Sequence, residues 1–195
     1  MAREIVEHHK TISIPVCLLH PEPLFLTVRD RRFKDWIFVA GGCRKREISN
    51  PLRCALRELE EETRGILNLK NGEYSYFTFT TRNRTEIEQR SDDSNNIDVV
   101  YIYHVYIFFM ELNEIERTRT VKKFNEERIK TDQLKQLNIP IRRTHDENDR
   151  MMWDTLDNFK KKKQWETIKT HVLENPEFVE SVNTSNRTKF NTKVS

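Results

Sequence analysis

One segment of the chain, an amphipathic helix predicted over Asn50–Arg64, constrains the fold more than any other. Asn50 is a suitable N-cap, Pro51 fits the first helical turn, and Gly65 is suited to end the helix. Four apolar side chains recur at helical spacing: Leu52, Ala55, Leu56 and Leu59. The sequence therefore predicts a short helix that packs one face on a larger apolar core.

The opposite face of this helix gathers carboxylates. Glu58, Glu61 and Glu62 are three and four residues apart, so they share one face. Glu60 is rotated away from them. Like charges on one face repel each other, and Mg²⁺ or Mn²⁺, which prefer oxygen ligands, would neutralise them. The alternative is a solvated acidic face, so the neighbouring sequence has to decide.

The residues before the helix provide that context. The apolar segment Trp36–Ala40 predicts a short strand that ends at Gly41 and Gly42, where the backbone could approach a metal-bound phosphate closely. Glu47 lies six residues after Gly41 and ten before Arg57, where its carboxylate could hold the arginine. This context favours a metal site over a solvated face.

The arrangement resembles the Nudix box, in which glycine, glutamate, an Arg-Glu pair and a Glu-Glu pair follow one another along a loop, a helix and a loop. Nine residues separate Glu47 from Arg57, two more than in the family pattern. Arg64 stands where glycine is usual, and Ala40 replaces the usual proline. The resemblance to the Nudix hydrolase superfamily implies an α+β fold, an α/β/α sandwich around a mixed sheet.

The resemblance also implies roles for residues of the box. Nudix enzymes cleave a nucleoside diphosphate linked to another moiety, with metals that orient a water and stabilise charge on the pyrophosphate. Carried over, Glu58, Glu61 and Glu62 are ligands of Mg²⁺ or Mn²⁺, and Glu61 and Glu62 belong to the catalytic set. Arg57 would orient Glu58 or Glu47 rather than touch substrate, with Glu47 as structural support.

In several family members a further glutamate, on a loop beyond the central strand, acts as metal ligand or general base. Glu126 and Glu127 precede a strand predicted near Arg128–Lys130 and stand at about that place. An exposed turn is the alternative. Geometry must decide, because a base has to reach the attacking water.

The remaining segments predict a single domain of residues 1–180, since 195 residues suit one core. Ile97–Met110 is apolar at nearly every position and is expected to be a central strand covered on both faces. Arg82–Asn96 is predicted to be a mobile hairpin loop, and a short helix is expected from Thr131 or Asp132. Other predicted strands are Thr11–Leu19, Leu24–Val28 and Glu73–Thr81.

The C-terminal part is predicted to be helical. Past Pro140, apolar spacings indicate two helical stretches within about residues 146–180, bent near the lysine run Lys160–Lys163. Residues 181–195 are polar and are expected to form a flexible tail.

Two substrates stay open at this stage. The pattern, including Arg64-Gly65-Ile66, looks most like the baculovirus ADP-ribose pyrophosphatase-type proteins, which implies a viral origin and cleavage to AMP and ribose 5-phosphate. The proline that many ADP-ribose-selective members carry beyond the box is absent. The rival substrate is the cap of mRNA, from which related viral decapping enzymes release methylated GDP.

Capped RNA would need a basic path and a stacking residue. Arg44, Lys45 and Arg46 beside the metal could supply the path, together with Arg82, Arg84, Arg142 and the run Lys160–Lys163. Gly41 and Gly42 are expected to contact the substrate phosphates through their backbone. Trp36 or Tyr74 could stack on a base, although a core position is the more natural assignment for Trp36. A module that only binds nucleotide or RNA is the alternative class, but it would be expected to carry a damaged acidic helix.

Composition limits the setting of the protein. The net charge is only +3, and the basic residues that give it fall in clusters that suit RNA or phosphate but can equally be solvated. The three cysteines lack metal-ligand spacing, and no apolar signal or membrane segment is apparent. The sequence therefore predicts an intracellular protein, in the cytoplasm of an infected host cell, without a membrane partner. The oligomeric state, a homodimer included, stays open.

Overall fold

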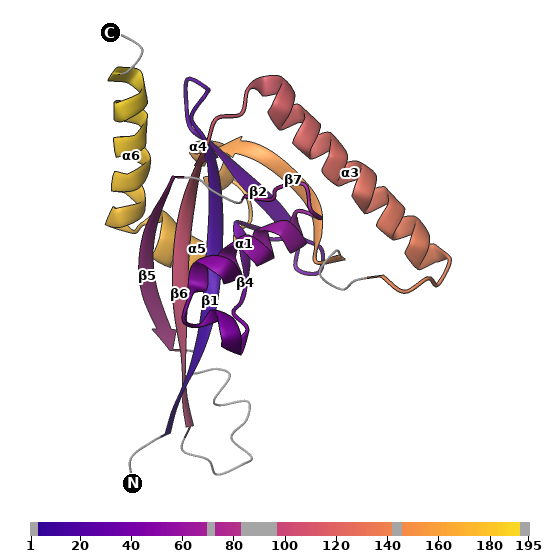
Figure 1. The fold of residues 1–195 in the computed structure, drawn as a ribbon, viewed down its shortest axis with the longest axis horizontal. Coiled ribbons are helices and arrows are strands. Elements are labelled where there is room, and N and C mark those ends of the chain that lie inside the picture. Colours follow the sequence, from indigo (N-terminus) through magenta and orange to yellow (C-terminus); the bar gives the residue numbers. More distant parts are fainter. Residues whose placement is uncertain (1–3, 70–72, 83–96, 142–145, 192–195) are drawn as a thin grey trace.

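The computed structural model describes residues 4–69, 73–82, 97–141 and 146–191. Within these residues a mixed seven-stranded sheet has the order β3-β2-β1-β6-β5, with β4 also paired to β1 and β7 to β2 (Figure 1). The strands are β1 (Glu4–Cys17), β2 (Leu24–Asp30), β3 (Trp36–Ile37), β4 (Val39–Gly42), β5 (Tyr74–Arg82), β6 (Ile97–Met110) and β7 (Asn148–Thr155).

The parallel strands β1 and β6 form the centre of the sheet. The two strands pair over their whole length, from Glu4 opposite Ile97 to Cys17 opposite Met110. Antiparallel β5 flanks β6 on its other side. The prediction of a long strand over Ile97–Met110 is confirmed, and its lack of alternation is explained by apolar packing on both faces.

Helices cover both faces of the sheet. On one face lie α1 (Pro51–Glu62) and α3 (Glu114–Gln136), which bury Leu59 and Phe124. On the other face α4 (Leu156–Lys160), α5 (Glu166–Ile168) and α6 (Pro176–Asn191) pack over a second core, in which Phe38 and Phe178 are fully buried (Figure 1). The predicted α+β class, an α/β/α sandwich with a mixed sheet, is confirmed.

Helix α3 corrects the prediction of a strand near Arg128–Lys130 followed by a short helix. It is one helix of 23 residues, and it begins in a capping box in which Asn113 and Glu116 exchange hydrogen bonds of 2.8 and 3.0 Å. Only Arg117, Phe124 and Thr131 are buried along it. These positions are seven apart, so the helix buries a narrow stripe, and its apolar pattern is too sparse to stand out in the sequence.

Strand β7 corrects the prediction of helix from about residue 146. It pairs with β2 from Leu24 opposite Thr155 to Asp30 opposite Asn148. Met151 and Met152 enter the cores on opposite faces of the sheet, as the alternation of a strand requires. Because both faces are covered, apolar side chains follow no clean period of two, and the segment resembles a helix in sequence.

The predicted strand Trp36–Ala40 is divided between β3 and β4, and β4 continues through both glycines. The tail expected from residue 181 begins inside α6, which extends to Asn191. Of the hairpin loop predicted over Arg82–Asn96, Arg82 is the last residue of β5, and residues 83–96 lie outside the described residues. In the part of the chain that the structure describes, no helix is long and apolar enough to cross a membrane.

Candidate pyrophosphate and metal site on helix α1

The two ends of α1 determine where this helix, with its acidic face, begins and stops. Pro51 occupies the first turn, whereas Asn50 sits at the N-cap without the expected side-chain hydrogen bond. At the C-terminus the Gly65 amide donates to the Glu60 carbonyl (2.7 Å) and the Arg64 amide to the Glu61 carbonyl (3.1 Å). This pattern is a Schellman motif.

The motif explains the displaced glycine of the box. Arg64 has φ 60° and Gly65 φ 75°, so two consecutive residues adopt the left-handed conformation, although Arg64 has a side chain. The buried guanidinium of Arg64 donates to Thr131 Oγ1 and to the carbonyl of Asn148, both at 2.9 Å. The arginine thus ties the end of α1 to α3 and β7.

The glutamates are distributed as the helical spacing predicts. Glu58 and Glu62 are buried (8% and 4% exposed), and the side chain of Glu61 is 26% exposed. Glu60 is exposed and accepts a hydrogen bond from Asn68 at the surface (3.2 Å). Two carboxylates are therefore withdrawn from water beside a third that is partly open.

Arg57 organises this cluster. Its guanidinium grips Glu47 with two hydrogen bonds of 2.8 Å, and its Nη1 donates to Glu58 (2.7 Å) and Glu61 (3.1 Å). It also donates to the carbonyl of Gly42 (3.0 Å). This geometry agrees with the expectation that Arg57 orients Glu58 or Glu47, because its guanidinium donates hydrogen bonds to both carboxylates.

The longer loop does not displace Glu47. A 3₁₀ turn over Lys45–Glu47 buries the glutamate, whose Oε2 also accepts from the Arg44 amide (2.9 Å). Hydrogen bonds from Arg57 lower the pKa of Glu47 to about 2, against an opposing effect of burial. The carboxylate is therefore ionised at neutral pH and keeps Arg57 in place.

Gly41 and Gly42 differ in what surrounds them. A Cβ at Gly41 would lie 2.0 Å from the carboxyl carbon of Glu58, whereas a Cβ at Gly42 would meet nothing within 4 Å. Real Cβ atoms do not approach other atoms so closely. A side chain at position 41 would therefore push the Glu58 carboxylate out of its place against β4.

The carboxylates repel one another. Burial, with the nearby charges of Glu61 and Glu147, raises the pKa of Glu58, although Arg57 opposes it. Burial raises the pKa of Glu62 well above its usual range, and Glu58 and Glu147 raise it further, against a hydrogen bond from Asn148 (2.8 Å). A divalent cation would relieve this repulsion, so the donor set fits Mg²⁺ or Mn²⁺.

The carboxylates are at present held by Arg57 and Asn148. Accordingly, no group of three His, Cys, Asp or Glu side chains among the described residues already surrounds a single point for a metal ion. Sequence reasoning missed Glu147 and Asn148, which come next to the acidic face because Asp30 pairs with Asn148 across β2 and β7. No local pattern signals this pairing.

The other predicted site residues fall in different places. Arg44 lies at the site, with Nη2 at 3.2 Å from Glu61, and Lys45 and Arg46 are exposed on the neighbouring turn. Trp36 takes the core position: it is 9% exposed, and Lys162 covers its ring at 4.1 Å.

Glu126 and Glu127 lie on α3 rather than on a turn. Glu127 is 2.6 Å from Lys130, and Glu126 is 4.0 Å from Lys122. The side chain of Glu126 is 53% exposed, and that of Glu127 is 43% exposed. The largest electrostatic influences on Glu58 and Glu62 include Glu147 and neither of these two glutamates.

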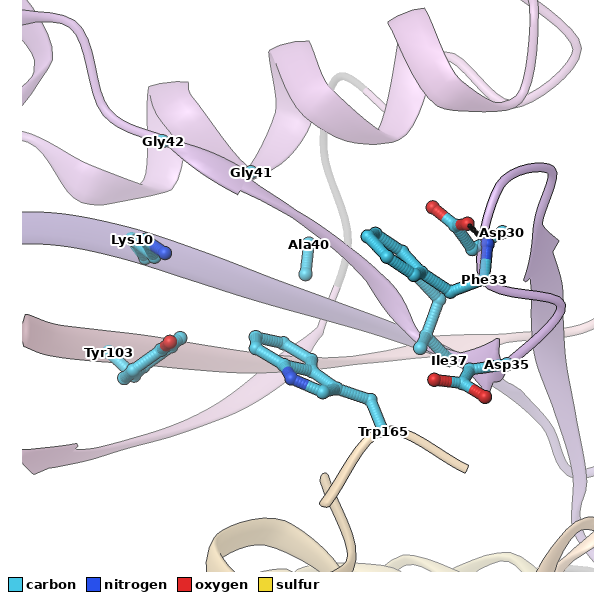
Figure 2. A pocket seen from close by; sticks show the side chains of 10 residues that line it. All are labelled: Lys10, Asp30, Phe33, Asp35, Ile37, Ala40, Gly41, Gly42, Tyr103 and Trp165. Carbon is cyan, nitrogen blue, oxygen red and sulfur yellow. Dashed lines mark hydrogen bonds between the residues drawn. The ribbon is translucent and has the colours of Figure 1, made fainter. Parts of the chain in front are cut away.

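A cavity of about 360 Å³ opens beside this site. Gly41 and Gly42 form part of its wall, so the strand that contacts Glu58 on one side lines the cavity on the other. Aromatic rings of Phe33, Tyr103 and Trp165 make up much of the remainder (Figure 2). The cavity is of the size that small-molecule sites have.

The model of the NUDIX domain matches residues 8–173. The chain belongs to the NUDIX domain family. The match takes in both the acidic helix and β7, so Glu147 lies within the NUDIX domain. No relative among curated protein sequences matches.

Solved structures give distant likenesses. A putative NUDIX hydrolase from Listeria monocytogenes has a TM-score of 0.47 at 14% identity, over 94% of this chain and 95% of that one. The NUDIX domain of Shewanella oneidensis NrtR, in complex with ADP ribose, has a TM-score of 0.45 at 11% identity, over 96% and 89%. A C. elegans Ap4A hydrolase has a TM-score of 0.42 at 10% identity, over 94% and 98%.

Proposed function

We propose that this NUDIX protein is a metal-dependent pyrophosphohydrolase that cleaves a nucleoside diphosphate linked to another group. The observation that carries the proposal is the placement of two buried carboxylates, Glu58 and Glu62, against β4 and next to Glu147. A protein that merely bound nucleotide would gain nothing from burying repelling negative charges beside the expected position of a phosphate.

Glu58, Glu61 and Glu62 would hold Mg²⁺ or Mn²⁺, which when bound neutralise the pyrophosphate and make a coordinated water more acidic. Arg57 keeps Glu58 and Glu61 in position through its 2.7 and 3.1 Å contacts. Glu47 fixes Arg57 in turn. Arg44, exposed beside Glu61, is placed to contact an incoming phosphate, with Lys45 and Arg46 on the same turn.

Glu147 is the best candidate for the general base. It is exposed and yet close enough to act on Glu58 and Glu62 electrostatically. A water between these groups would lose its proton to Glu147 as its oxygen attacks phosphorus and the anhydride P–O bond breaks. We prefer Glu147 to Glu126 and Glu127, whose contacts on α3 are with lysines.

ADP-ribose and the cap of mRNA are the two substrates that the sequence leaves open, and both contain the required linkage. The same hypothesis includes three further proposals: the protein binds RNA, it is related to baculovirus proteins, and it acts in the cytoplasm of an infected cell. Capped RNA has a basic entry in Arg44, Lys45 and Arg46, which are all exposed.

The test offers the purified protein ADP-ribose and cap-labelled RNA side by side, with Mg²⁺ or Mn²⁺ and then with a chelator. We expect metal-dependent release of AMP with ribose 5-phosphate, or of methylated GDP. Glu61→Gln and Glu62→Gln should abolish turnover, whereas the matched surface variant Glu60→Gln should retain it. Equal turnover by all four proteins, or none by the wild type on any nucleoside diphosphate derivative, would refute the proposal.

A further inference from the structure

The cavity beside Gly41 has a distinct charge at each end. Lys10 lies at one end, and the carboxylates of Asp30 and Asp35 lie at the other (Figure 2). Lys10 is on the side of Gly42, whose carbonyl is bound by Arg57 of the acidic site. A nucleotide in this cavity would therefore place its phosphates toward Lys10 and its base toward the aspartates.

Aromatic side chains line the space between the two ends. Phe33 is 60% exposed at the rim, and Trp165 stands across the cavity from it (Figure 2). Trp165 is held edge-on against the buried ring of Tyr103, with 6.1 Å between centroids. Such rings offer flat faces on which a nucleobase can stack.

The acidic end sets what kind of base can stack there. Asp30 Oδ1 accepts from the Phe33 amide (2.5 Å), which fixes the turn, and Asp35 is 2.5 Å from Lys163 at the surface. An ionised carboxylate only accepts hydrogen bonds. Guanine offers adjacent N1–H and N2–H donors, whereas adenine offers an N6 donor next to an N1 acceptor that a carboxylate would repel.

We propose that this cavity binds the nucleobase of the substrate, stacked between Phe33 and Trp165, and that Asp30 and Asp35 select guanine over adenine. This inference rests on the proposed pyrophosphohydrolase function and names its substrate class as a guanosine diphosphate derivative. A guanine alkylated at N7 fits as well, because its positive charge is attracted by aromatic faces and by both aspartates.

The test measures binding of GDP, 7-methyl-GDP and ADP to the full chain in Mg²⁺ by tryptophan fluorescence, with Trp165→Phe to assign the signal. We expect GDP or 7-methyl-GDP to bind at least tenfold more tightly than ADP. Phe33→Ala should weaken all three ligands by a similar factor, about tenfold or more. Equal or tighter binding of ADP to the wild type would overturn the inference without any variant.

The aspartates are tested by their effect on selectivity. Asp35→Asn and Asp30→Asn, which keeps an acceptor for the Phe33 amide, should lower the guanine-to-adenine ratio toward one and leave ADP binding within about twofold. The matched control is Asp157→Asn, an exposed aspartate in the first turn of α4. An unchanged ratio in both aspartate variants would contradict the assignment.

Hydrolysis separates this inference from the proposed function. Preferred cleavage of adenine substrates would leave the hydrolase standing and overturn the guanine preference. Guanine-selective binding without cleavage of any linked substrate would do the reverse.

Discussion

Gly41 and Glu58 are in such close contact that a Cβ on the glycine would come within 2.0 Å of the carboxyl carbon of the glutamate. Gly42 is adjacent and has nothing within 4 Å of the same position. The two neighbours therefore form a matched pair for mutagenesis.

Gly41→Ala should displace Glu58 from the acidic face. We expect Mn²⁺ affinity to fall by about tenfold or more, since one ligand of a small carboxylate set is lost. Gly42→Ala should bind Mn²⁺ like the wild type. Titration of Mn²⁺ by calorimetry measures both, and circular dichroism checks the fold. Wild-type Mn²⁺ affinity in a folded Gly41→Ala variant would show that this contact does not position the ligand.

Glu147→Gln should reduce kcat if this residue is the general base. Loss of a positioned base lowers a rate by about 10²- to 10⁴-fold. Glu126→Gln and Glu127→Gln should stay near the wild-type rate, because these residues pair with lysines on α3. Steady-state kinetics on one hydrolysed substrate compares all three. A larger loss from Glu127→Gln than from Glu147→Gln would reverse the assignment.

Arg64 combines an unfavourable backbone with favourable side-chain contacts, and two substitutions separate them. Arg64→Ala should lose the bonds to Thr131 and Asn148 while keeping the left-handed φ of 60°. Arg64→Gly should lose the same bonds but remove about 1 kcal/mol of backbone strain. Urea denaturation should therefore find Arg64→Ala the less stable of the two. The opposite order would mean that the backbone relaxes.

Asp149 should make stability depend on acid pH. Burial favours its neutral form, but hydrogen bonds from Arg29 and Lys34 outweigh that effect and lower its pKa to about 2. An unfolded aspartate titrates at about 3.9. Above about pH 4.5 the folded state therefore gains nearly the full benefit of the charge. As pH falls toward 2 the unfolded state is protonated first and the benefit is lost.

Urea denaturation of the wild type and Asp149→Asn between pH 6 and 2 measures this effect. The difference in free energy of unfolding should be constant above about pH 4.5 and shrink below it. The surface variant Asp157→Asn provides the baseline. A difference that does not change across this range would exclude a lowered pKa for Asp149.

The helix of the box was predictable because its signals are local. The spacing of Glu58, Glu61 and Glu62 fixes their common face, and Arg57 is within reach of Glu47 by loop length alone. The partners that complete the site are not local. Glu147 and Trp165 are brought in by the pairing of β7 with β2 and by the chain that follows it.

The misread segments share one physical cause. Helix α3 buries only three side chains, and β7 is covered on both faces, so neither shows the periodicity that distinguishes helix from strand. The Asn113–Glu116 capping box was a readable signal for the start of α3. Trp36 occupies the core position that the sequence also allowed, and its burial argues against the role of a stacking residue for the substrate.

Asn148 donates to Glu62 through its side chain and accepts from Arg64 through its carbonyl, and it lies 86 residues beyond the glutamate it holds. During synthesis, α1 therefore leaves the ribosome long before the strand that completes its acidic face. The nascent chain cannot assemble this site until β7 has emerged and paired with β2. The site is therefore completed only when β7 joins the sheet. A chain truncated before β7 would contain the whole box and would still lack Asn148, which holds Glu62.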